Sequence, residues 1–137
     1  MRIFLDANML FSAAKSDGAV LRLLELLIAA RHECRADGYV VEEGRRNLAA
    51  KAPGRLPALE NLLPRLHLAG AHPAPSALEA APRLAEKDRP VLAAAIRLGC
   101  DALVTGDRSR FGALYGKKPG GVAIHSPRSL AELLLLP

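Results

Sequence analysis

Aromatic residues are scarce in this chain, and tryptophan is absent. Aromatic residues make up 4% of the 137 residues, whereas half of the residues are hydrophobic, with leucine and alanine the most frequent. Strands of β-sandwiches and barrels are rich in aromatic and β-branched residues, so this composition argues against both architectures. It favours helices packed on a small sheet.

Cysteine is rare as well. The only two cysteines are Cys34 and Cys100. Two cysteines make no disulfide framework, and no Cys/His spacing in the sequence suggests a zinc site. Each cysteine lies in a segment that we interpret as part of the core, so we expect both to be small, buried core residues.

The sequence has no long apolar run. Its first segment, MRIFLDANMLF, carries Arg2 and Asp6 within a short apolar stretch, and it resembles neither a signal peptide nor a membrane span. There is no repeat, long polar tract or internal boundary. We therefore expect one domain over residues 1–137, located in the cytoplasm and without a membrane partner.

Several catalytic signatures are missing as well. The chain has no GxxxxGK phosphate loop and no Ser-His-Asp order, and its four histidines are scattered. Basic residues are in excess, with a formal net charge of +5 and a pI of about 9.7. If several acids gather in one cleft, the remaining surface is more basic still. Such a charge distribution suits a phosphodiester substrate.

The clearest pattern in the chain lies in residues 86–107. Apolar side chains recur at helical spacing over residues 91–99, and residues 102–105 are predicted to form a short buried strand. About 11 helical residues run roughly 16 Å away from one edge of the sheet, and about five strand residues run roughly the same distance back to it. Asp88 at the helix start and Asp107 after the strand should therefore share the sheet edge where open α/β folds bind ligands.

Other elements follow from similar patterns. Short strands are predicted at residues 32–36, 66–68 and 122–124, and a helix is predicted after a cap at Ser16 or Asp17. A strand–helix–strand unit favours a parallel pair with a right-handed crossover. The predicted fold class is therefore α/β.

Two further acids are expected at the same edge. Asp6 follows the apolar strand Arg2–Leu5, and Glu43 lies in a helix that Asp37 should cap. Neighbouring helical residues point about 100° apart, so only one of Glu42 and Glu43 can face the cleft, and we select Glu43. The predicted cluster consists of Asp6, Glu43, Asp88 and Asp107.

Four carboxylates in one place repel one another unless protons or a cation neutralise them. A hard divalent cation such as Mg²⁺ prefers oxygen ligands and keeps several waters. It can activate a water for attack on phosphorus and offset the charge of the phosphoryl oxygens. The cluster therefore predicts hydrolysis of phosphodiesters by metal-activated water.

With their surroundings, these acids resemble the motifs of the PIN domain, a family of metal-dependent nucleases that includes VapC-type toxins. The matching segments are Leu5-Asp6-Ala7-Asn8, residues 42–48, Lys87-Asp88 with residues 91–95, and Leu103-Val104-Thr105-Gly106-Asp107. The resemblance extends from residue 3 to residue 130, and its last segment is the most specific.

The resemblance implies a three-layer α/β/α fold around a short parallel sheet, and Mg²⁺- or Mn²⁺-dependent cleavage of RNA that leaves a 5′-phosphate. It implies that Asn8 and Thr105, with Ser12 as a further candidate, orient the carboxylates. Family toxins are commonly homodimers neutralised by an antitoxin, so both partners are implied here. Arg108 and Arg110 flank the predicted cleft and are expected to contact RNA phosphates.

Each acid also has an ordinary structural alternative. Asp6 and Asp88 could cap helices, Asp107 could be a turn residue, and Glu43 could be a solvated helix acid. For the whole chain, the alternatives are a noncatalytic nucleic-acid-binding PIN module and a housekeeping RNA-processing nuclease. A haloacid-dehalogenase-type phosphatase also starts from an aspartate after its first strand, but it needs a second acid where this chain has Asn8.

Overall fold

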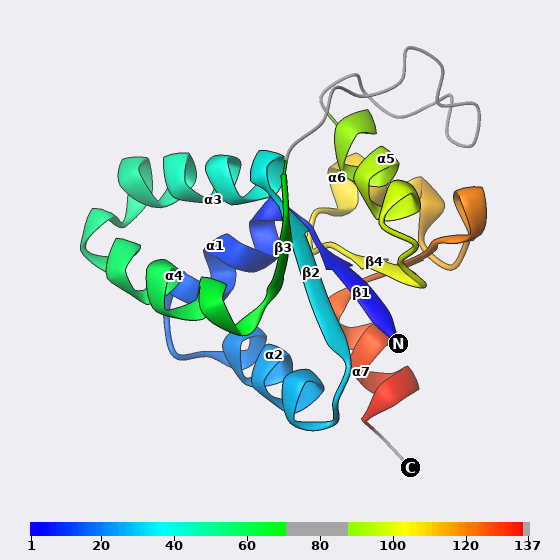
Figure 1. Cartoon of the computed structure of the whole chain (residues 1–137), viewed down its shortest axis with the longest axis horizontal. Coiled ribbons are helices and arrows are strands. Elements are labelled where there is room, and N and C mark those ends of the chain that lie inside the picture. The colour runs from blue at the N-terminus through cyan, green and yellow to red at the C-terminus, as the bar shows by residue number, and fades with distance from the viewer. Residues whose placement is uncertain (71–87, 136–137) are drawn as a thin grey trace.

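The computed structural model describes residues 1–70 and 88–135. In this part of the chain, five parallel strands form one sheet in the order β3-β2-β1-β4-β5 (Figure 1). The strands are β1 Arg2–Leu5, β2 Glu33–Asp37, β3 His67–Ala69, β4 Ala102–Val104 and β5 Ala123–His125. The predicted α/β class is confirmed.

Helices connect the strands. The α-helices are α1 Ala7–Lys15, α2 Ala19–Ala29, α3 Gly38–Lys51, α4 Leu56–Leu62, α5 Arg89–Arg97, α6 Arg108–Phe111 and α7 Pro127–Leu134. Short 3-10 helices lie at Pro53–Arg55, Leu63–Arg65, Gly112–Leu114 and Pro119–Gly121. None of the described helices is long and apolar enough to cross a membrane.

The direction of the crossovers determines the layers. The chain steps from β1 to β2 to β3 in one direction along the sheet, and from β3 through β4 to β5 in the other. Because parallel crossovers are right-handed, the two sets of helices must cover opposite faces. Figure 1 shows α1, α3 and α4 on one side of the sheet and α5 and α6 on the other. The predicted three-layer α/β/α fold is confirmed.

The central strand is buried on both faces. Ile3, Phe4 and Leu5 of β1 are all 0% exposed, as expected when helices cover both sides of a parallel sheet. Cys34 and Cys100 belong to the same core and are not paired. Burial raises the pKa of both thiols to about 11, so they stay protonated. Their predicted role as buried core residues is confirmed.

The predicted cap of α2 is wrong. Neither Ser16 nor Asp17 caps this helix: its N-cap is Gly18, which makes no side-chain bond. Asp17 instead pairs with Arg55, whose Nη2 lies 3.2 Å from the aspartate Oδ1. A contact with a residue distant in sequence therefore takes the side chain away from the helix end. The cap predicted at Asp37 is confirmed, because its carboxylate accepts a bond from the Val40 N–H.

Helix α5 ends beside Gly99, the glycine at which the sequence predicts a helix end. Gly99 adopts a φ of 66°, the left-handed conformation that glycine tolerates best after a helix, and the Cys100 N–H bonds back to the Ala95 carbonyl. The chain then enters β4. Asp101, just before this strand, accepts a bond from the Arg2 N–H at 2.8 Å, so it lies at the amino edge of the sheet. Residues 86 and 87, the predicted start of this unit, lie outside the described residues.

Candidate active site

The direction of the connections reverses between the adjacent strands β1 and β4. In open α/β sheets, ligands bind beyond the carboxyl ends of the strands at such a reversal. The residues that follow the two strands are Asp6 after β1 and residues 105–107 after β4. This edge of the sheet is therefore the candidate active site.

Asp6 joins the ends of the two strands. It is 0% exposed, and its Oδ1 accepts a bond from the Ala7 N–H at 2.7 Å, so it caps α1. Its Oδ2 accepts the hydroxyl of Thr105 at 2.9 Å. The capping role considered as an alternative is thus observed. A cap alone needs no bond to the end of another strand, so Asp6 has a second role at this edge.

The Thr105 hydroxyl is the centre of a hydrogen-bond network. It donates to Asp6 and accepts from Asn8 Nδ2 at 3.0 Å and from the Asp107 N–H at 3.2 Å. A hydroxyl offers one donor and two acceptor sites, so its capacity is used in full. Asn8 Oδ1 also accepts from the Gly106 N–H at 3.0 Å, and Asn8 Nδ2 lies 3.3 Å from Asp6 Oδ2. The network joins the start of α1 to the turn that carries Asp107.

Asp107 and Asp88 each stand before a helix at this edge. Asp107 is half-buried, and its carbonyl, just before α6, accepts a bond from the Phe111 N–H at 3.1 Å. Asp88 is 1% exposed and occupies the N-cap position of α5. Its side chain makes no capping hydrogen bond, so the structural alternative suggested for Asp88 is not observed.

The two glutamates of α3 differ in exposure. Glu42 is exposed, whereas Glu43 is half-buried and its Oε2 atom is buried. The next residue, Gly44, faces α1: a Cβ built on it would lie 3.5 Å from the Leu10 Cβ. This close approach of α3 to α1 turns Glu43 partly inward and leaves Glu42 in solvent.

The structure brings some of the predicted site residues together. Asp6, Asn8, Thr105 and the backbone of Asp107 share one network, in which Ser12, half-buried one turn after Asn8, takes no part. Within residues 1–70 and 88–135, no three His, Cys, Asp or Glu side chains lie close enough to hold one metal ion. The joint coordination of an ion by the four predicted acids, Asp6, Glu43, Asp88 and Asp107, therefore stays a prediction.

The donor chemistry at this edge suits a hard cation. The predicted ligands are carboxylates only, and two of them, Asp6 and Asp88, are almost completely buried. Both cysteines are buried core residues, so no sulfur ligand is offered. Oxygen-only ligands are those that Mg²⁺ and Mn²⁺ prefer, and the residues present therefore fit such an ion.

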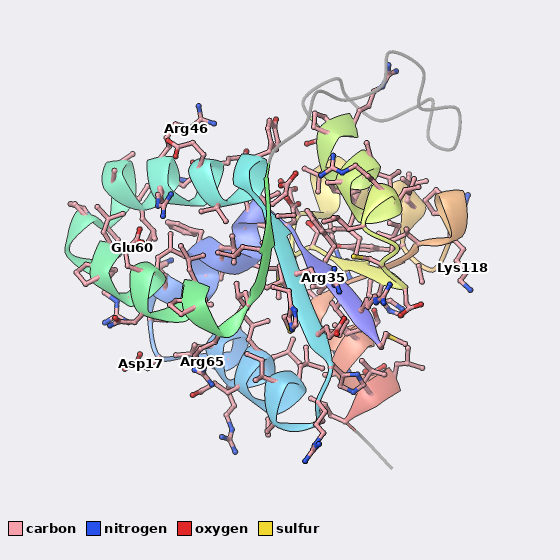
Figure 2. All side chains as sticks on the ribbon, in the orientation of Figure 1. Asp17, Arg35, Arg46, Glu60, Arg65 and Lys118 are labelled. Atoms are coloured by element: carbon pink, nitrogen blue, oxygen red, sulfur yellow. The ribbon has the colours of Figure 1, made fainter. Side chains whose placement is uncertain are left out.

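The predicted RNA-contacting residues begin α6. Arg108 is exposed at the first position of this helix, directly after Asp107. The Arg110 side chain lies outside the described part of the structure, although its backbone belongs to α6. Two other exposed basic residues, Arg46 and Lys118, extend into solvent at the left and right of the view in Figure 2.

Tyr115 is a site neighbour that the sequence analysis missed. Its hydroxyl donates to the Thr105 carbonyl at 2.8 Å. Burial raises the pKa of Tyr115, and the carboxylates of Asp107 and Asp6 raise it further against the opposing effect of Arg108. The phenol therefore stays protonated and can donate. No motif or periodicity in the sequence marks Tyr115, because its partner is the backbone carbonyl of Thr105, ten residues earlier and just after β4.

The histidine that ends β5 makes the stability of the fold sensitive to mild acid. Burial lowers the pKa of His125 below its ordinary value of 6.5, and its Nδ1 lies 2.9 Å from Ser129 Oγ. Between pH 6.5 and the lowered value, the unfolded chain binds a proton that the folded chain does not. Stability is therefore lost as the pH falls through this range, by at most about 1.4 kcal/mol per pH unit for one group.

We expect urea denaturation to give a lower free energy of unfolding at pH 5.5 than at pH 7.5. His125→Gln should lose less over this interval, because its side chain does not titrate. Some loss should remain, since burial also lowers the pKa of His32. Equal losses in the wild type and in His125→Gln would show that His125 is not a source of the sensitivity.

The chain is similar to a known family in sequence and to known proteins in fold. The family model described as "PIN domain" matches residues 2–109. No curated protein sequence matches the chain.

Three solved structures have a similar fold. VapBC2 from Rickettsia felis, bound to a DNA fragment from its promoter, has a TM-score of 0.66 at 16% identity, with 92% of this chain and 98% of that chain covered. FitAcB from Neisseria gonorrhoeae has a TM-score of 0.63 at 20% identity, covering 92% and 98%. FitAB bound to the IR36 DNA fragment has a TM-score of 0.60 at 18% identity, covering 91% and 94%.

Proposed function

The chain belongs to the PIN domain family, and on this premise we propose that it is a Mg²⁺-dependent endoribonuclease, the toxin of a toxin–antitoxin pair. Nuclease activity is the general property of the family. The metal, the RNA substrate and the role as a toxin are our proposals for this chain, and we treat its 137 residues as one nuclease domain.

One observation supports the proposal most directly. The buried carboxylate of Asp6 accepts the Thr105 hydroxyl at 2.9 Å, at the sheet edge where the connections reverse, and the Asp107 N–H bonds to the same hydroxyl. Burying a carboxylate is costly unless it is bonded, paired or bound to a metal. The Asp6 carboxylate also lies beside the turn that carries the acid Asp107, and a bound cation would offset the repulsion between two such negative charges.

The residues have distinct roles in this proposal. The ligands of Mg²⁺, direct or through water, would be Asp6, Asp88 and Asp107, with Glu43 positioning water or a second ion; Mn²⁺ would substitute. When bound, the cation would supply an activated water and offset charge on the phosphoryl oxygens. Asn8 and Thr105 orient Asp6 through their hydrogen bonds, and Arg108 would contact phosphate.

The test is cleavage of a single-stranded RNA in Mg²⁺, Mn²⁺ or EDTA by the wild type and by Asp88→Asn and Asp107→Asn. We expect metal-dependent products with 5′-phosphate ends from the wild type. Each variant should be slower by about 100-fold or more, because it removes one negative charge from the ion site. Undiminished activity in both variants would reject these site residues.

RNA-binding and growth measurements separate the alternative functions. A noncatalytic binding module would bind RNA equally well with and without EDTA and would give no product. A housekeeping nuclease would cleave RNA without arresting growth when it is induced in cells. Sequencing the RNA ends that form after induction would identify the substrate in either case.

Further proposals concern partners and location. The three similar structures are complexes named for two components, VapBC2, FitAB and FitAcB, and two of them are bound to DNA. We propose that an antitoxin protein likewise binds this chain, and that the chain forms a homodimer. The two unpaired, buried thiols fit the reducing cytoplasm as the place where it acts.

A further inference from the structure

The carbonyl of Thr105 lacks the partner that a continued strand would provide. β4 and β5 are parallel, with Val104 opposite His125, and the Thr105 N–H donates to the His125 carbonyl at 3.0 Å. In a parallel ladder with this register, the next donor to the Thr105 carbonyl would be the N–H of residue 127. That residue is Pro127, which begins α7 and has no N–H.

Tyr115 supplies the missing donor. Its hydroxyl reaches the Thr105 carbonyl at 2.8 Å from the segment that follows α6. This segment is itself tied to β5, because the Gly116 N–H donates to the Ile124 carbonyl at 3.1 Å and the Ile124 N–H donates to the Lys117 carbonyl at 3.0 Å. The phenol is therefore held by the last strand of the sheet.

The same phenol lies beside the candidate ion site. The negative charges of Asp107 and Asp6 both act on Tyr115, and so does the positive charge of Arg108. Thr105 is thus held at both ends: its side chain bonds to Asp6 and its carbonyl bonds to Tyr115. Two residues later the chain reaches Asp107.

We propose that Tyr115 is a positioning residue of the nuclease site, which holds the turn between β4 and α6 and thereby sets the position of the Asp107 carboxylate relative to Asp6. This inference rests on the proposed function, and it assigns to Tyr115 a role outside the acidic motifs. Without the hydroxyl, the Thr105 carbonyl must find water and the turn gains freedom. A carboxylate on a freer turn binds a cation less tightly.

The test is Mn²⁺ binding to Tyr115→Phe, measured by the loss of the electron paramagnetic resonance signal of free Mn²⁺, at a temperature where circular dichroism shows every protein folded. We expect affinity to fall by about 10-fold, the lower end of the range for residues that orient ligands. The control is Arg55→Met, which also removes a side-chain donor to a backbone carbonyl, that of Ala14 at 2.8 Å. It should bind Mn²⁺ as the wild type does.

The outcomes separate this inference from the function on which it rests. If the wild type binds Mn²⁺ and Tyr115→Phe binds it equally well, the positioning role is wrong and the nuclease proposal stands. If Arg55→Met loses as much Mn²⁺ affinity as Tyr115→Phe, the effect is a general loss of stability of the fold, and the positioning role is again wrong. If the wild type does not bind Mn²⁺, the proposed function fails first.

Discussion

Replacing Asp6 with asparagine is expected to lower RNA cleavage by about 1,000-fold, because several kcal/mol of metal-dependent stabilisation depend on the ion site. Asp6 is 0% exposed and accepts the Thr105 hydroxyl, so the fold holds this predicted ligand firmly. An amide has no charge to offer a cation, and its NH₂ group would face the donor Nδ2 of Asn8 in one of its two orientations. The measurement is the initial rate on single-stranded RNA in saturating Mn²⁺.

The matched control is Asp101→Asn. Asp101 makes a hydrogen bond to the Arg2 N–H but stands at the opposite edge of the sheet, so its substitution should change the rate by less than about twofold. Circular dichroism should show both variants folded at the assay temperature. Wild-type rates for a folded Asp6→Asn would rule out the ion site at this edge.

Replacing Phe111 with alanine is expected to cost about 3–5 kcal/mol of unfolding free energy, the usual range for deleting a buried aromatic ring. Phe111 is 0% exposed and belongs to the main core, and it ends α6. For a domain of this size, such a loss corresponds to a melting temperature lower by about 10–20 °C. Thermal denaturation followed by circular dichroism measures it.

Phe11→Ala provides the comparison for the same change of side chain. Phe11 is only half-buried, and the ammonium groups of Lys15 and Lys51 lie over its ring, 5.8 and 5.5 Å from the ring centre. Losing an exposed cation–π contact and part of the ring's packing should cost about 1–2 kcal/mol. If the Phe11 variant lost as much stability as the Phe111 variant, burial would not explain the larger effect.

The positions of the elements could largely be predicted from local patterns. The strand at Arg2–Leu5 and the glycine that follows α5 are where the sequence places them. Strand ends were shifted by one residue in places: β2 runs to Asp37, which both ends the strand and caps α3. The cap of α2 was wrong because Asp17 takes a distant partner, and sequence spacing carries no information about that partner.

The sequence predicted which residues meet at this edge of the sheet, but it did not predict all of the hydrogen bonds between them. Asp6, Asn8 and Thr105 follow strands whose carboxyl ends must meet, so their proximity could be expected from the fold class. The contribution of Tyr115 could not, because it depends on the register of β4 against β5 and on proline standing at residue 127.

The amino-acid sequence by itself determined the α/β class and which acids follow which strands, because the period of apolar residues and the helix caps act between residues close along the chain. Only the tertiary structure decided which atoms meet. The hydroxyl of Thr105 finds a carboxylate 99 residues away, and its carbonyl finds a phenol from a loop that β5 holds. Such pairings depend on how the strands align and how the core packs, and both are settled only when the whole chain folds.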